Sequence, residues 1–107
     1  MAWTVHLKES VIDDLRWFGK KDGRILLKEV EQRLPADPLT VTQNMKTLRP
    51  NPVAQRELRL LGKYGIWFDV DEETENVTIV LVGEKRGDSL LVRGEEFAEY
   101  HESDSTE

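Results

Sequence analysis

The residues of this chain that are best suited to chemistry are cations near three apolar segments. They are Lys46, Arg49, Arg56, Arg59, Lys63, Lys85, Arg86 and Arg93. Arg59 stands between Leu58 and Leu60, so in an extended segment its side chain faces away from theirs. Arginine binds two phosphate oxygens at once through its planar guanidinium, and Tyr64 could stack on an exposed base. The pattern indicates a phosphate-binding surface; the competing interpretation is that these cations only solvate a domain with 34% charged residues.

Other chemistries find little support in the residues. The chain has no cysteine, which excludes disulfides and thiolate metal sites. His6 and His101 lie far apart in sequence, so we expect no metal site, and no glycine-rich phosphate loop has the usual spacing. The N-terminus lacks the basic start and apolar stretch of a signal peptide, and no apolar run approaches the roughly 20 residues of a membrane helix. We expect a soluble cytoplasmic protein without cofactor, metal or membrane partner.

The net charge of −6 comes from one end of the chain. Six of the 21 acidic residues lie in 95–107, which contains no Lys or Arg, so the other 15 acids balance the 15 bases of the body. A solvated, mobile end is the usual meaning of such a tail. With 107 residues, a single domain is expected.

The first part of the chain predicts a strand and two helices. Apolar residues alternate over 3–7 (Trp3, Val5, Leu7), which is typical of a half-buried strand with these side chains toward the core. A first helix has Ser10 as its expected N-cap. We expect the segment 19–23 to break the first helix and Asp22 to cap the second helix, which ends before Pro35, so that the two helices form a short hairpin. The apolar stripes of the two helices are Val11, Leu15 and Phe18, then Leu26, Leu27, Val30 and Leu34.

The second part predicts a sheet. The proline-rich segment 35–55 reads as a long connection. Nearly continuous apolar runs predict central strands covered, at least in part, on both faces. We expect 83–89 to form a turn and 90–92 a short extended segment. The predicted strands span about 55–61, 65–70 and 77–82. The order β-α-α-β-β-β predicts an α+β fold in which a two-helix hairpin packs on an antiparallel β-sheet.

Three quoted segments carry a resemblance to a known family. They are "LKESVIDDLRWF" (7–18), "LRPNPVAQRELRLLGKYGIWFDVDEE" (48–73) and "VTIVLVGEKRGDSLLVRGEEF" (77–97). This pattern resembles the RelE/ParE family of bacterial type II toxins over about residues 3–97. We therefore expect one RelE-like domain over 1–97 and an acidic flexible tail over 98–107.

The resemblance implies a function. RelE-like members cut messenger RNA in the ribosome by driving a ribose 2′-hydroxyl onto the adjacent phosphate, and a cognate antitoxin holds them inactive. ParE-like members share the fold and target DNA gyrase. Carried over to this chain, the expected catalytic residues are Arg56 and Arg59 on a cationic strand, with Lys85 or Arg86 on a cationic turn. The expected RNA-binding residues are Lys46, Arg49, Lys63 and Tyr64.

Two positions depart from the family pattern. Gly65 stands where the family usually has an arginine after the tyrosine, and Leu91 falls where some RelE members carry a catalytic tyrosine. Gly65 could mark a missing phosphate clamp, an attenuating substitution (natural or engineered), or a backbone bulge that it shares with Gly62. The expected function is therefore a RelE-like mRNA endoribonuclease, which the change at Gly65 could attenuate, and the alternative is a non-catalytic toxin-like protein that binds gyrase or only its antitoxin.

Overall fold

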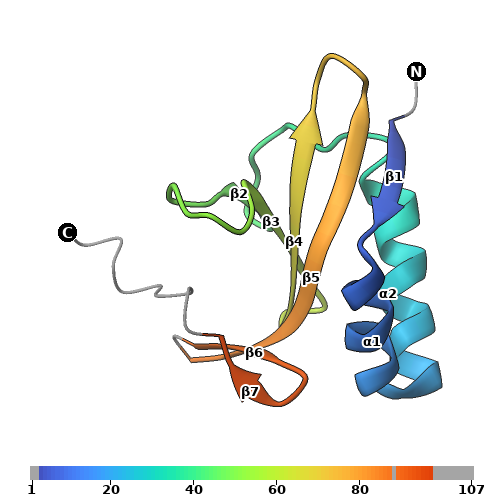
Figure 1. The fold of residues 1–107 in the computed structure, drawn as a ribbon, viewed down its shortest axis with the longest axis vertical. Helices are drawn as coiled ribbons and strands as arrows, with labels where there is room; N and C mark the ends of the chain where they lie inside the picture. Colours follow the sequence, from blue (N-terminus) through green and yellow to red (C-terminus); the bar gives the residue numbers. More distant parts are fainter. Residues whose placement is uncertain (1–2, 88, 98–107) are drawn as a thin grey trace.

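A helical hairpin packs on one face of a seven-stranded sheet in the computed structural model, which describes residues 3–87 and 89–97 (Figure 1). The elements are β1 (Thr4–Leu7), α1 (Glu9–Trp17), α2 (Gly19–Arg33), β2 (Met45–Thr47), β3 (Arg56–Leu60), β4 (Tyr64–Asp71), β5 (Asn76–Arg86), β6 (Ser89–Val92) and β7 (Glu95–Glu96). The strand order is β2-β3-β4-β5-β6-β7, and β1 also pairs with β5. The α+β class and element order predicted from the sequence are confirmed.

The long strand β5 joins the two ends of the chain. β1 lies parallel to its first half, with Thr4 opposite Asn76 and Leu7 opposite Ile79. β6 lies antiparallel to its last residues, 84–86. All other strand pairs are antiparallel. The strand predicted over 3–7 and the extended segment predicted over 90–92 are confirmed as β1 and β6. The sequence pattern did not specify the parallel pairing of β1 or the strands β2 and β7, because pairing partners are chosen by tertiary packing.

A carboxylate fills the gap that β1 and β6 leave along β5. Asp14 of α1 is 2% exposed, and its Oδ2 accepts a hydrogen bond of 3.1 Å from the backbone N–H of Val82. Arg93, in the turn between β6 and β7, places its Nε 3.5 Å from Asp14 Oδ1. A helix side chain therefore satisfies a buried donor of β5 on the side where neither β1 nor β6 pairs with it.

The main core lies between the helices and the sheet. Apolar side chains of alternate strand positions meet the helical stripes there, as period-2 and 3.6-residue patterns require. Its buried members are Val11, Leu26, Val30, Leu34, Met45, Leu58, Leu60, Tyr64, Ile66, Phe68, Val77, Ile79 and Val82. Leu7 was expected in this core but is exposed, because it is the last residue of the edge strand β1.

The helix boundaries differ from those expected. α1 begins at Glu9 with Lys8 as its N-cap, so Ser10 lies inside the helix. The first helix does end next to this segment, at Trp17, but the segment 19–23 is itself the first turn of α2, so Asp22 is not a cap. Gly23 lets the helices approach closely: a Cβ there would lie 2.8 Å from the Leu15 carbonyl oxygen. This packing requirement overrides the usual helix-breaking meaning of glycine.

The strand boundaries also differ from those expected. The segment predicted as a turn over 83–89 begins inside β5, so Lys85 and Arg86 are strand residues. Leu61 and Gly62 form the β3–β4 turn with φ values of 54° and 72°. The tail expected over 98–107 lies outside the described residues. Within the described part of the chain, no helix is long and apolar enough to cross a membrane.

We predict that Asp14 makes stability depend on pH in a specific direction. Burial raises the pKa of Asp14 above its ordinary value of 3.8, partly opposed by the Val82 N–H and Arg93. The folded state therefore binds this proton more readily than the unfolded chain. The contribution of Asp14 to the free energy of unfolding should be greatest at low pH and fall as pH rises from about 4 through the raised pKa.

Urea unfolding of the parent and Asp14→Asn between pH 4 and 7 measures this effect. The stability of the parent relative to Asp14→Asn should decline with rising pH, whereas Glu31→Gln, a change of an exposed acid on α2, serves as the control. Asp14→Ala should lose about 1–3 kcal/mol at any pH, because it leaves the buried Val82 N–H unpaired. A pH-independent difference between the parent and Asp14→Asn would contradict the assignment.

Candidate functional site

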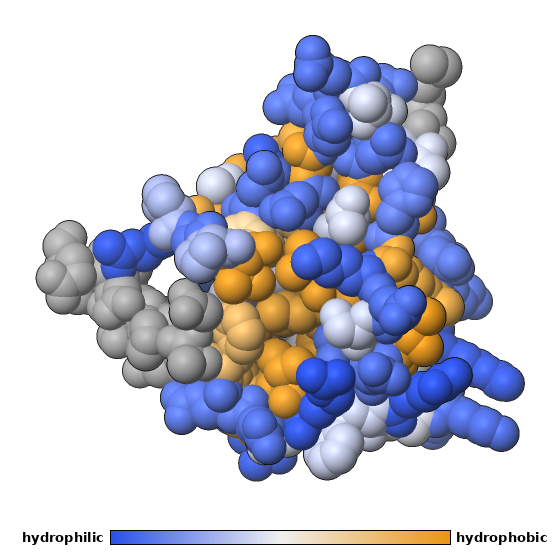
Figure 2. Space-filling view, in the orientation of Figure 1, coloured by the Kyte–Doolittle hydropathy of each residue, from blue (hydrophilic) through white to orange (hydrophobic). Residues whose placement is uncertain are grey.

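The face of the sheet away from the helices carries a second apolar cluster, which we call the open face. Alternation along β4 assigns its side chains: Ile66 and Phe68 point to the helices, and Trp67 points to the open face. Figure 2 shows apolar surface gathered in a hollow over this side of the sheet. The buried members are Ala54, Trp67, Val80, Leu81 and Leu90, with Leu48, Val53, Val92 and Phe97 packed around them.

A buried carboxylate is the centre of the polar groups on the open face. Glu57 of β3 is 1% exposed, and its Oε2 accepts a hydrogen bond of 3.1 Å from Trp67 Nε1. Its Oε1 lies 3.4 Å from Lys46 Nζ and 3.8 Å from Lys85 Nζ. Trp67 and Lys46 are the cross-strand partners of Glu57 on β4 and β2, and Lys85 comes from the end of β5. Four strands thus contribute to one ion-paired cluster, which we call the Glu57 cluster.

Gly65 makes room for this carboxylate. A Cβ at position 65 would lie 2.6 Å from Glu57 Oε2, which is too close for a real contact, and 3.3 Å from Leu90 Cδ1, which is tighter than most real contacts. Gly65 lies in β4 opposite Arg59 and Gly83, its φ is not positive, and the register shift of this strand pair falls between Trp67 and Phe68. The bulge expected at Gly65 is therefore wrong, and its backbone could carry any residue if the space were free.

Gly83, the neighbour of Gly65 on β5, also leaves space on the open face because it has no side chain. A Cβ there would lie 2.8 Å from the carbonyl oxygen of Leu91 and 2.9 Å from Leu90 Cδ1. Gly65 and Gly83 are paired across β4 and β5. Leu90, fully buried, lies over both glycines. The position of the expected family arginine is thus filled by Glu57 and Leu90.

Arg59 lies on the open face, as its place between two core leucines predicted. It is half-buried, and its Nε has no hydrogen-bond acceptor among the described residues. Its cross-strand neighbour is Gly65, which offers no side chain. A buried guanidinium N–H without an acceptor is costly, so Arg59 has capacity to bind an anionic group.

Lys46 and Lys85 meet at Glu57, but the remaining predicted cations do not join them. Arg56 pairs across the sheet with Phe68 on the helix side, and its Nη1 donates to the Leu39 carbonyl oxygen at 3.3 Å. Arg86 is exposed, with its Nε 3.8 Å from Glu84 Oε2. Arg49 is exposed in the loop before β3.

Tyr64 is unavailable for base stacking, which corrects that expectation. It is 3% exposed in the main core, its ring packs edge-on against Phe18, and its hydroxyl lies 3.5 Å from Asp22 Oδ2. Exposed Lys63 places its Nζ 5.0 Å from the centre of the Tyr64 ring. The sequence suggested an aromatic next to cations; the pleat of β4 turns this ring toward the helices.

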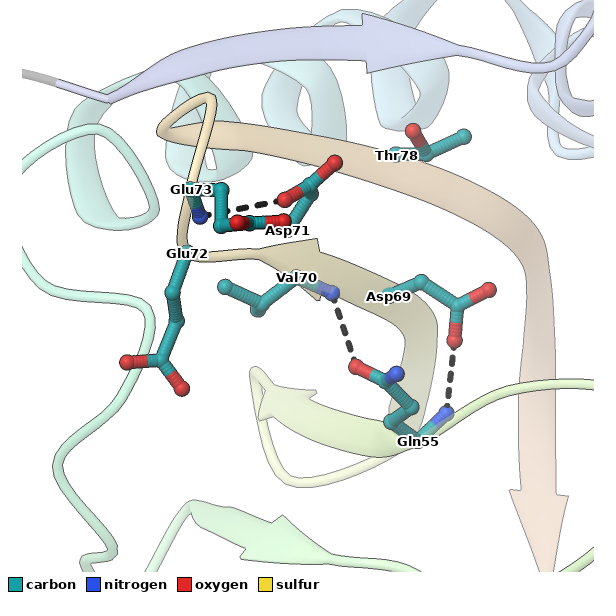
Figure 3. A pocket seen from close by; sticks show the side chains of 7 residues that line it. All are labelled: Gln55, Asp69, Val70, Asp71, Glu72, Glu73 and Thr78. Carbon is teal, nitrogen blue, oxygen red and sulfur yellow. Dashed lines mark hydrogen bonds between the residues drawn. The ribbon is translucent and has the colours of Figure 1, made fainter.

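A second hollow, of about 500 Å³, lies at the end of β4 (Figure 3). Gln55 crosses it: its N–H donates to Asp69 Oδ1, and its Oε1 accepts from the Val70 N–H, each at 2.9 Å. The lining includes four acids, so this hollow is unsuited to phosphate. Its lining residues are Gln55, Asp69, Val70, Asp71, Glu72, Glu73 and Thr78. Among the described residues, no group of His, Cys, Asp and Glu could hold a metal ion.

Glu57 and Trp67 are the functional-site residues that sequence reasoning missed. Their signal was present in the sequence: period-2 alternation places Glu57 on the same side of β3 as Arg59, and Trp67 on the same side of β4 as Gly65. An acid in a nearly apolar sheet needs a partner when it is buried. What the sequence did not contain is the pairing register that puts Glu57 opposite Trp67 and Lys46.

Comparisons with known proteins bear on the fold. No family model and no curated protein matches the sequence. The RelBE2 toxin–antitoxin complex of Mycobacterium tuberculosis has a chain that is 21% identical, with a TM-score of 0.67 over 79% of this chain and 100% of that one. A double mutant of the Escherichia coli toxin RelE in the free state is 26% identical, with a TM-score of 0.56 over 78% of this chain and 83% of that one. The resemblance seen in the sequence is confirmed: the chain has the fold of the RelE toxins.

Proposed function

We propose that this chain is the toxin of a type II toxin–antitoxin pair in the bacterial cytoplasm and that it acts by binding a protein target. The RelE-like fold supports the toxin assignment, and the solved complex of a similar toxin with its antitoxin supports an antitoxin partner. The Glu57 cluster is the observation that carries the choice of binding over RNA cleavage. DNA gyrase is the target that the ParE side of the resemblance suggests.

The charge of the Glu57 cluster disfavours phosphate. Lys46 and Lys85, which a scissile phosphate would need, already face the buried Glu57 carboxylate. In a site with little water, a carboxylate repels a phosphate more strongly than it would at the surface. The same carboxylate lies against Gly65 and leaves no space for the arginine of the family pattern.

Proton transfer is also poorly provided for. Cleavage by a 2′-hydroxyl needs one group to accept a proton and another to donate one. Tyr64 is buried against Phe18, and Leu91 has no proton to give. Glu57 is buried and ion-paired, so it cannot reach a substrate without leaving its partners.

One observation favours a second candidate function, the attenuated mRNA endoribonuclease acting at the ribosome. The buried Nε of Arg59 has no acceptor among the described residues, and an RNA phosphate would supply one. A positioned arginine can stabilise charge on a phosphorane. Among the described residues, neither Tyr64 nor Leu91 supplies the proton transfer that rapid cleavage needs.

Cleavage assays separate the two candidates. We expect the purified chain to leave both free and ribosome-bound mRNA intact, whereas its expression without an antitoxin still arrests growth. Arg59→Ala, with the exposed Arg86→Ala as control, identifies the source of any cleavage that is seen. Cleavage that disappears in Arg59→Ala alone would replace the binding proposal with the endoribonuclease.

We predict that a side chain added at Gly65 and one added at Gly83 destabilise the fold through contacts with different groups. Gly65→Ala should cost about 1–3 kcal/mol of stability in the parent, the usual range for overpacking, and Gly65→Arg should cost more and gain no RNA cleavage. Most of the Gly65→Ala cost should vanish in a Glu57→Ala background, because Glu57 Oε2 is the nearest atom. Gly83→Ala meets backbone, so Glu57→Ala should not relieve it. Urea unfolding of the parent, the three single alanine variants and the two double variants tests this coupling.

The antitoxin proposal gives a separate prediction. Co-expression with the small reading frame next to this gene should yield a complex that survives gel filtration. An antitoxin segment that packs on the open face would bury the apolar cluster of that face. Arg59→Glu should weaken the complex by reversing one charge on that face, and Lys63→Glu is the matched control. Separate elution of the two parent proteins at micromolar concentration would refute the pairing.

A further inference from the structure

We propose that the Glu57 carboxylate fills an oxyanion site from within the chain and thereby makes the open face reject phosphate. The donors of this oxyanion site are Lys46 Nζ, Lys85 Nζ and Trp67 Nε1. Glu57 is then a specificity-determining residue, and the ligand that its removal would admit is a phosphate group. This inference deepens the proposed function, because it explains why a RelE-like face would bind protein and not RNA.

The geometry is that of an anion held by converging donors. The Trp67 N–H reaches one carboxylate oxygen at 3.1 Å, and the two ammonium groups approach the other at 3.4 and 3.8 Å. Each donor comes from a different strand, so the sheet itself fixes their separation. Phosphate accepts hydrogen bonds from the same donor types, so it can take the place of the carboxylate.

The space that the Glu57 carboxylate occupies fits a compact group with oxygen atoms. Glu57 Oε2 lies 2.6 Å from the position that a Cβ of residue 65 would take, and Leu90 closes one side. Truncation of Glu57 leaves a polar cavity bounded by two ammonium groups and an indole N–H. Such a cavity differs from an apolar void, because the groups that line it are the polar groups that face the Glu57 carboxylate in the parent.

The charge explains why the native chain would exclude phosphate. Glu57 is almost fully buried, whereas Lys46 remains 43% exposed, so Lys46 is the side from which a ligand can approach the cluster. An incoming phosphate would meet a desolvated carboxylate of like charge at the position that it needs. Like charges placed side by side at an interface cost several kcal/mol, which amounts to more than about a tenfold loss of affinity.

Inorganic phosphate is the probe that tests this inference. We expect Glu57→Ala to bind phosphate at least about tenfold more tightly than the parent, with a rise in melting temperature and a change in tryptophan fluorescence. Acetate, which restores a carboxylate, should also stabilise Glu57→Ala. Glu84→Ala is the matched control: it releases Arg86 from a surface ion pair at 3.8 Å with the same change of charge but without converging donors.

Equal phosphate affinity in folded Glu57→Ala and in Glu84→Ala would overturn the inference. If Glu57→Ala does not fold in plain buffer, refolding in acetate or phosphate becomes the measurement. Recovery with either anion supports the inference, whereas failure with both, while Glu57→Gln folds normally, overturns it. RNA cleavage by the parent would refute the proposed function alone, because this test measures phosphate on a variant and uses no RNA.

Discussion

The open face depends on one buried negative charge. Glu57 sits in a sheet whose other central positions are almost all apolar, and an isolated carboxylate there would be very costly. Two lysines and an indole N–H make the burial tolerable, and they fix how β2, β3, β4 and β5 are aligned on this side. Gly65 follows from the same constraint, because the carboxylate needs the space of its side chain.

A second buried carboxylate performs a related task on the helix side. Asp14 reaches from α1 to the backbone of β5 where neither β1 nor β6 covers it, and Arg93 comes back from the β6–β7 turn to neutralise it. Helix, central strand and C-terminal hairpin are thereby tied at one point. Asp14 pairs with a backbone N–H of β5 that neither β1 nor β6 reaches, and Glu57 fills the space beside Gly65. In both places a charged side chain supplies a contact that strand pairing does not.

The proposed function follows from which cations are ion-paired with Glu57 and which are not. A RelE-like fold with several Lys and Arg residues near its sheet suggests phosphate chemistry, but these cations lie in different places and contact different groups. Lys46 and Lys85 face Glu57, Arg56 turns to the helix side, and Arg59 alone keeps a buried N–H without an acceptor among the described residues. The same fold can therefore present a surface for protein partners, because function is set by the site and not by the fold.

Local pattern in the sequence was enough for the fold class, the three long strands, the helical stripes and the outward position of Arg59, because side-chain periodicity is a local property. It misplaced the helix caps and the extent of β5, where packing at Gly23 and pairing with β6 overrode local preference. The sequence also singled out Gly65 without explaining it. Only the tertiary structure decided that Glu57, Lys46, Trp67 and Lys85 meet, because that depends on the register between strands distant in sequence.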